Sequence, residues 1–176
     1  MRNESNLIRK ALEFAAKAHR TQERKGTDIP YIVHPMEAAL ILAQAGASDF
    51  LIAAALLHDT LEDTNTTEQE LEDVFGETMV KFVRYMTRND DLDWFEYRQH
   101  SIERLATSSR EEMMLFLADK LANLRSIAAD YSEIGDQLWV RFNKGREDQR
   151  WYYTSVAKEL SPLSDVAAYH EYVLLV

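Results

Sequence analysis

Apolar residues recur at helical spacing along most of this chain, and runs that alternate polar with apolar residues are nearly absent. Leu7, Ala11, Leu12, Ala15 and Ala18, for example, lie on one face of a predicted helix. Five glycines and three prolines leave few forced breaks in 176 residues. We therefore predict an all-α fold, a compact multi-helix bundle in which residues 1–176 form a single domain.

Capping residues locate several helix boundaries. Pro35 suits the first turn of an apolar helix over 36–45, which Gly46 ends, and Ser48 or Asp49 can cap the next helix. Capping-box spacing occurs twice, in Thr67–Glu70 before a helix that Gly76 stops, and in Ser109–Glu112 before a helix of about 20 residues. Further helices are expected over 77–87, 94–106 (with Trp94 and Phe95 entering the core) and 145–175, the last split near Ser161–Pro162.

Composition excludes several classes of protein. With no cysteine, the chain can form neither disulfides nor zinc-thiolate sites, and it lacks a thiol nucleophile. Its net charge of −10 repels nucleic-acid backbones, so we expect no nucleic-acid partner. The N-terminal residues lack the apolar core of a signal peptide, and no apolar stretch is long enough to span a membrane. We expect a soluble, cytoplasmic protein.

The segment 21–31 interrupts two predicted helices. It contains Arg24, Lys25, Gly26 and Pro30. Long loops in compact domains are often functional, so the two cations are candidates for binding a ligand. The alternative is a solvated connector.

The apolar run 53–57 ends in a cluster of titratable side chains. His58 and Asp59 follow directly, and although neighbours on a helix point about 100° apart, near a helix end they can share one ion. Glu62 and Asp63 lie four residues beyond them, on the same side if the helix continues. Imidazole nitrogen and carboxylate oxygen together suit Mn, Fe, Zn or Mg. The alternative is an ordinary helix end with a solvated acidic face.

Two residues elsewhere strengthen the metal interpretation. His34 follows the loop in the stretch YIVHP, immediately before a predicted helix. Asp119 is a carboxylate within an apolar helical stretch, and Asn123 follows it by four residues. A buried charge is costly unless it is paired or bound to a metal. The alternatives for Asp119 are a salt bridge to Lys120 or Arg125 and an exposed helix face.

In this order, His34, His58–Asp59 and Asp119 resemble the pattern of the HD metal-dependent phosphohydrolase superfamily. The surrounding stretches resemble, more narrowly, the hydrolase domain of RelA/SpoT-type stringent-response enzymes; they read AAKAHRTQERKGTDIPYIVHP, AALLHDTLEDT, FGETMVKFVRYMT and LADKLANLRSI. The length matches the stand-alone form of that family, the small alarmone hydrolases. The resemblance covers about residues 5–130 and is looser over 131–176.

The resemblance implies an HD-domain helical bundle and hydrolysis of ppGpp or pppGpp to GDP or GTP and pyrophosphate, usually with Mn²⁺. It also implies roles for ten residues. The metal would be held by His34, His58, Asp59 and Asp119, with Glu62 and Asp63 as the carboxylate pair beside it; Arg24 and Lys25 match the loop pair that packs on the guanine, and Asn123 and Ser126 match positions that line the nucleotide side of the pocket. The family often has Thr where this chain has Ser126.

The sequence departs from the family pattern in two places. The loop between Lys25 and Pro30 varies in length within the family, which leaves the base specificity open. The segment LWVRFNKGREDQRWYY does not align cleanly with the better-known members. We interpret its Lys144, Arg146 and Tyr152 as helix-surface charges and a core aromatic rather than as phosphate or ribose contacts.

Three other functions remain open at the level of sequence. One is an HD phosphohydrolase for another nucleotide, such as NADPH or a nucleoside phosphate; another is a catalytically silent nucleotide-binding module; the third is a plain helical interaction domain. The intact Glu62 and Asp63 argue against a silent module. For partners we predict a small guanine nucleotide and no membrane, and leave a homo-oligomer or an alarmone-synthesising partner open.

Overall fold

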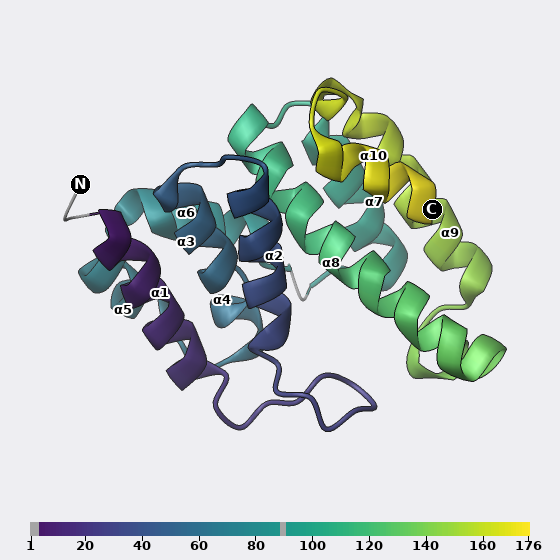
Figure 1. Ribbon diagram of the computed structural model, residues 1–176, viewed down its shortest axis with the longest axis horizontal. Coiled ribbons are helices and arrows are strands. Elements are labelled where there is room, and N and C mark those ends of the chain that lie inside the picture. The colour runs from purple at the N-terminus through teal and green to yellow at the C-terminus, as the bar shows by residue number, and fades with distance from the viewer. Residues whose placement is uncertain (1–3, 89–90) are drawn as a thin grey trace. The chain divides into compact units, whose positions relative to one another are not determined.

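The computed structural model describes residues 4–88 and 91–176 (Figure 1). Within these ranges the chain is helical, and its one β-feature is an isolated antiparallel bridge between Glu23 and Pro30. This confirms the all-α prediction. No helix among the described residues has both the length and the apolar composition needed to cross a membrane. The chain divides into two compact units, Met1–Arg88 and Asn89–Val176. The single domain therefore stays a prediction.

The first unit is built around one helix that is apolar after its first residue. Its helices are α1 (Glu4–Ala18), α2 (Val33–Gln44), α3 (Asp49–Leu57), α4 (Thr60–Asp63), α5 (Glu68–Phe75) and α6 (Glu77–Met86). Every residue of α3 from Leu51 to Leu57 is buried, because α1, α2 and α6 all pack against it. A helix that is apolar on all sides is stable when all its sides are buried. Because α3 is packed on several sides, its C-terminal end and the residues that follow it, His58 and Asp59, are held in a defined position.

The predicted caps account for the helix boundaries of this unit. The Ser48 hydroxyl accepts a 3.3 Å hydrogen bond from the Leu51 N–H and caps α3. Thr67 and Glu70 form both bonds of a capping box at the start of α5. Gly76 then separates α5 from α6 with φ of 83°, a left-handed value that glycine adopts without strain.

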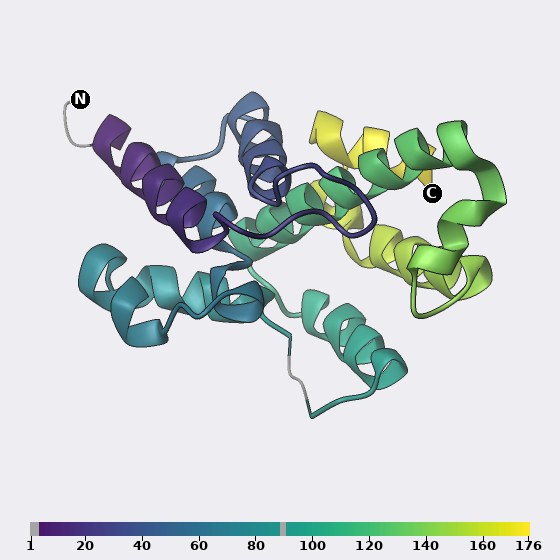
Figure 2. The same ribbon diagram turned by 90° about the horizontal axis from the view of Figure 1, so that it is seen from below.

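The second unit is organised along one long helix. Its elements are α7 (Trp94–Leu105), α8 (Arg110–Ile134), the 3₁₀ segment η1 (Gly135–Arg141), α9 (Arg146–Glu159), the 3₁₀ segment η2 (Ser161–Leu163) and α10 (Ala167–Leu175). The predicted capping box of Ser109 and Glu112 starts α8. From its far end the chain turns back through η1 into α9, as the green part of Figure 2 shows. The split near Ser161–Pro162 is confirmed, because η2 lies between α9 and α10.

Three details of this unit differ from the sequence prediction. Helix α8 has 25 residues rather than about 20, since no breaker occurs before Gly135. The segment η1 was not predicted, because short 3₁₀ turns lack a distinct sequence period. The prediction for Phe95 was wrong: its side chain is 46% exposed and stacks on Trp151, with ring centroids 4.8 Å apart. Trp94 is half-buried.

Candidate metal centre

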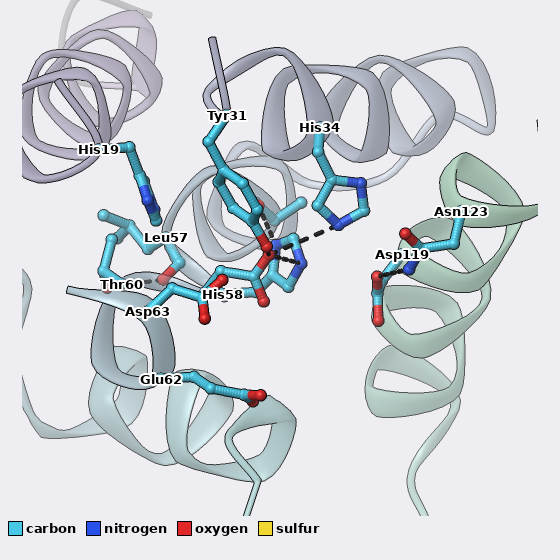
Figure 3. A network of polar contacts seen from close by, with 12 residues as sticks. His19, Tyr31, His34, Leu57, His58, Thr60, Glu62, Asp63, Asp119 and Asn123 are labelled. Atoms are coloured by element: carbon cyan, nitrogen blue, oxygen red, sulfur yellow. Dashed lines mark hydrogen bonds and ion pairs between the residues drawn. The ribbon is translucent and has the colours of Figure 1, made fainter. Parts of the chain in front are cut away.

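Two imidazoles and one carboxylate of the first unit converge. His34, His58 and Asp59 each offer one ligand atom, and these atoms lie within 4.8 Å of one another. The distance to Asp59 Oδ2 is 3.5 Å from His34 Nε2 and 3.1 Å from His58 Nε2. Both histidines are buried, at 3% and 1% exposure, and Figure 3 shows their rings pointing to one place. The structure therefore brings together three of the four predicted metal ligands.

The protonation of His58 shows that this cluster suits a cation. Its Nδ1 lies 2.7 Å from the Ala55 carbonyl oxygen. A carbonyl only accepts, so Nδ1 carries the hydrogen and, in the neutral ring, Nε2 presents a lone pair to the Asp59 carboxylate. Two electron-rich atoms 3.1 Å apart repel unless a proton or a metal ion lies between them. The donor set thus fits a divalent metal, whose histidine ligands typically donate their second N–H to a carbonyl.

Tyr31 supports the carboxylate of the cluster. Its hydroxyl donates a 2.7 Å hydrogen bond to Asp59 Oδ2. Burial raises the pKa of this hydroxyl well above its ordinary value, and the negative charges of Asp59 and Asp63 raise it further. Tyr31 therefore remains a donor at every physiological pH and holds Asp59 in one orientation. Its ring also packs edge-on against His34, with centroids 5.9 Å apart.

A second chain of hydrogen bonds reaches Asp63. The Nδ1 of the buried His19 lies 2.7 Å from Gln22 Oε1, and Gln22 Nε2 donates to Asp63 Oδ2 at 3.4 Å. Because the Gln22 oxygen accepts, His19 Nδ1 is the donor. His19 stacks on Tyr31 at a centroid distance of 5.0 Å. One packed group thus orients both Asp59 and Asp63.

The predicted carboxylate pair lies on a separate short helix. Helix α3 ends at Leu57, His58 and Asp59 form a turn, and α4 begins at Thr60. The Asp63 N–H nevertheless bonds to the Asp59 carbonyl at 2.9 Å, so the spacing of one turn survives. Glu62 and Asp63 are exposed, and Glu62 Oε2 accepts a 2.8 Å bond from the Arg88 N–H.

The loop between α1 and α2 is exposed along most of its length and contains internal hydrogen bonds. The Glu23–Pro30 bridge closes it, with Arg24 N–H bonded to the Ile29 carbonyl at 2.9 Å. The Thr27 hydroxyl donates to the Arg24 carbonyl at 2.9 Å. These bonds fix the backbone of Arg24, whereas Lys25 is exposed. The roles of Arg24 and Lys25 toward a nucleotide stay predictions.

The remaining predicted residues belong to the second unit. Asp119, Asn123 and Ser126 follow one another on one face of α8. Asp119 is 4% exposed; Asn123 donates to its Oδ1 at 2.8 Å, and Lys120 Nζ lies 2.6 Å from its Oδ2. Burial, the largest single influence, lowers the pKa of Lys120, but the Asp119 charge and the neighbouring tyrosines, Tyr152 and Tyr97, together raise the net pKa. The salt bridge between Asp119 and Lys120, one of the alternatives from sequence, is therefore present. The role of Asp119 as a metal ligand stays a prediction.

Comparison with known proteins shows what this chain is similar to. The model of the HD domain family matches residues 11–141. A guanosine-3′,5′-bis(diphosphate) 3′-pyrophosphohydrolase, MESH1 of Danio rerio, is 41% identical over 124 residues, which are 69% of each protein. MESH1 of Homo sapiens is 41% identical over 130 residues, 72% of this chain and 73% of that one. A guanosine-3′,5′-bis(diphosphate) 3′-pyrophosphohydrolase of Aquifex aeolicus is 39% identical over 123 residues, which are 68% of this chain but only 18% of that longer protein.

Two solved structures have the same fold. One is a metazoan ortholog of SpoT that hydrolyzes ppGpp, which superposes with a TM-score of 0.78 at 28% identity over 96% of this chain and 93% of that one. The other, lmo0812 from Listeria monocytogenes, has a TM-score of 0.75 at 34% identity over 81% of this chain and 95% of that one. The helical architecture and the buried cluster are thus accompanied by similarity along most of the chain.

Proposed function

Since the chain belongs to the HD domain family, whose model matches residues 11–141, we propose that it hydrolyses ppGpp and pppGpp at the 3′ position with a divalent metal, Mn²⁺ being the ion we expect. The observation that carries this proposal is the cluster of the buried His34 and His58 with the half-buried Asp59. The names of the relatives at about 40% identity supply the substrate class.

The chain's own residues divide the work of this reaction. His34, His58, Asp59 and, by the proposal, Asp119 would hold the ion. When bound, it supplies Lewis acidity, which lowers the pKa of a water molecule and polarises a phosphoryl group. Tyr31 keeps Asp59 oriented through its 2.7 Å hydrogen bond. In this proposal the exposed carboxylate of Asp63, to which Gln22 donates a hydrogen bond, rather than that of Glu62, accepts a proton from the attacking water.

The reaction balances as an ordinary hydrolysis. The water oxygen forms a bond to the 3′-linked phosphorus, and the bond from that phosphorus to the 3′ oxygen breaks. The 3′ oxygen takes up a proton, and the products are GDP or GTP and pyrophosphate. In this scheme Arg24 and Lys25 bind the nucleotide from the loop, and Asn123 and Ser126 bind it from α8. Their positive and polar groups allow a chain of net charge −10 to accept a polyanion.

Asp63→Asn tests the chemistry at this site. We expect release of pyrophosphate from ppGpp with Mn²⁺ to fall at least about 100-fold, because loss of a general base costs 10²–10⁴-fold. Bound Mn²⁺ should be retained. The matched control is Asp73→Asn, an exposed residue of α5, which should keep full turnover. Full activity in Asp63→Asn would contradict the role of that carboxylate. If the metal-loaded wild type releases no pyrophosphate from ppGpp, the substrate is another nucleotide.

A further inference from the structure

The second unit contains a cavity that none of the predicted site residues lines. It measures about 480 Å³, within the range of small-molecule pockets, and side chains of α8, η1, α9 and α10 surround it. Leu124 and Tyr131 face it from α8, roughly 120–140° around the helix axis from Asp119. These two residues thus point away from Asp119, whereas Ile127, which also lines the cavity, lies one turn after Asn123.

The charged side chains around this cavity are cationic, against the trend of the whole chain. The sequence has 30 Asp and Glu but 20 Lys and Arg, whereas the described residues that line the cavity include Arg146 and Arg150 and no acidic side chain. Arg146 lies 3.8 Å from Asp136, but both side chains are largely exposed, which makes this pair weak. These two guanidinium groups can pair with an anion.

Two aromatic rings and a buried amide also line the cavity. Tyr131 and Trp139 have ring centroids 6.1 Å apart, and the Arg146 guanidinium lies 5.5 Å from the Tyr131 centroid. Gln149 is 5% exposed and lines the cavity, where its amide can both donate and accept. The buried Nε1 of Trp139, also a lining residue, has no hydrogen-bond partner in the described structure. These groups suit a ring that has polar edges.

The start of α9 adds to the attraction for an anion. Arg146, Gln149 and Arg150 belong to its first turns, and its N-cap is Gly145, which has no side chain to bond the first N–H groups. The first N–H groups of a helix lack intrahelical partners and carry partial positive charge. Glu147 and Asp148 lie in the same turn but do not line the cavity.

We propose that this cavity binds an aromatic anion, meaning a planar ring system that carries a phosphate or carboxylate. The ring packs against Tyr131 and Trp139, and the anionic group lies between Arg146, Arg150 and the start of α9. Guanidinium groups pair with phosphate and carboxylate in a bidentate manner and also stack on rings, so one lining serves both parts of the ligand. This inference does not depend on the proposed hydrolase activity.

Nuclear magnetic resonance of the indole N–H groups tests the proposal with GMP as the probe. The chain has three tryptophans, and the Trp139 signal is the one missing from Trp139→Phe. We expect GMP, added up to about 10 mM to metal-free protein, to shift this signal saturably. Guanosine or inorganic phosphate alone should bind at least about tenfold more weakly. If inorganic phosphate binds as tightly as GMP, the ring of the ligand has no role and that part of the proposal is overturned. If GMP causes no saturable shift of the Trp139 signal, the whole proposal is overturned.

Two variants locate the binding. Arg150→Gln should weaken GMP about tenfold, because it removes a charge-assisted contact. Lys158→Gln makes the same charge change on an exposed residue of the same helix away from the cavity and should leave the affinity unchanged. Equal weakening in both variants would overturn a defined site. The Trp139 shift should persist in His58→Ala; its loss there would assign the binding to the metal cluster and overturn the proposal.

Discussion

At the residue scale, the candidate site depends on the groups that hold its two carboxylates, Asp59 and Asp63. His34, His58 and Asp59 meet as the motif indicated. Tyr31 and Gln22, which orient Asp59 and Asp63, were missed, because a tyrosine and a glutamine in a loop carry no spacing that separates them from solvated residues. The one available signal was local: Tyr31 lies three residues before His34, just ahead of α2.

Tyr31→Phe tests this support directly. The change removes the 2.7 Å hydrogen bond to Asp59 Oδ2 and leaves the ring in place. We expect Mn²⁺ affinity, measured by calorimetric titration, to fall about 10–100-fold, as for other outer-shell partners of metal ligands. Tyr169→Phe is the matched control, since it removes a hydroxyl hydrogen bond to the Ala157 carbonyl in the second unit. Equal affinity in Tyr31→Phe and wild type would leave Tyr31 with a packing role only.

At the element scale, helices with capping residues were predictable, because Ser48, Thr67 and Ser109 make the bonds that their spacing indicates. The turn at His58 and Asp59 was not predictable from the sequence, because nothing in the apolar run before it marks the end of α3. The exposure of Phe95 was also not predictable from the sequence. Its ring stacks on Trp151, which is distant in the sequence, instead of packing in the core.

The junction of α5 and α6 depends on one backbone conformation. Gly76 has φ of 83°, and a Cβ there would meet no heavy atom within 4 Å, so Gly76→Ala isolates the cost of backbone strain. We expect the free energy of unfolding in urea to fall by about 1–3 kcal/mol. Gly145→Ala is the control, because its surroundings are equally open and its φ is −71°. The account requires Gly76→Ala to be clearly the less stable of the two.

At the scale of the whole molecule, the two compact units were the feature least accessible to sequence. The boundary between Arg88 and Asn89 lies in a short polar stretch without the Gly, Pro or Ser enrichment of a linker. The position of Asp119 relative to the cluster therefore rests on the motif and the family. Buried tyrosines give the second unit a stability that depends on pH.

Burial raises the pKa of Tyr153 to about 12, although Lys120 and Arg98 act in the opposite direction. The unfolded value is about 10, so the contribution to stability is complete below pH 10 and is lost as the pH rises toward 12; the difference corresponds to roughly 2–3 kcal/mol. Urea midpoints measured between pH 9 and about 12 should decline less in Tyr153→Phe than in wild type. Tyr131→Phe, at a more exposed ring, should follow the wild type, and parallel curves for all three proteins would refute the assignment.

The central claim is that the cluster of two buried histidines, His34 and His58, and the half-buried Asp59 is a metal centre. Electron paramagnetic resonance of Mn²⁺ added to the purified protein tests it most directly, with His58→Ala as the comparison. We predict one tightly bound Mn²⁺ per wild-type chain, with nitrogen couplings from the two imidazoles, and loss of the bound ion in a His58→Ala variant that remains helical by circular dichroism. A wild-type protein that binds no Mn²⁺, or a His58→Ala variant with an unchanged spectrum, would contradict the account.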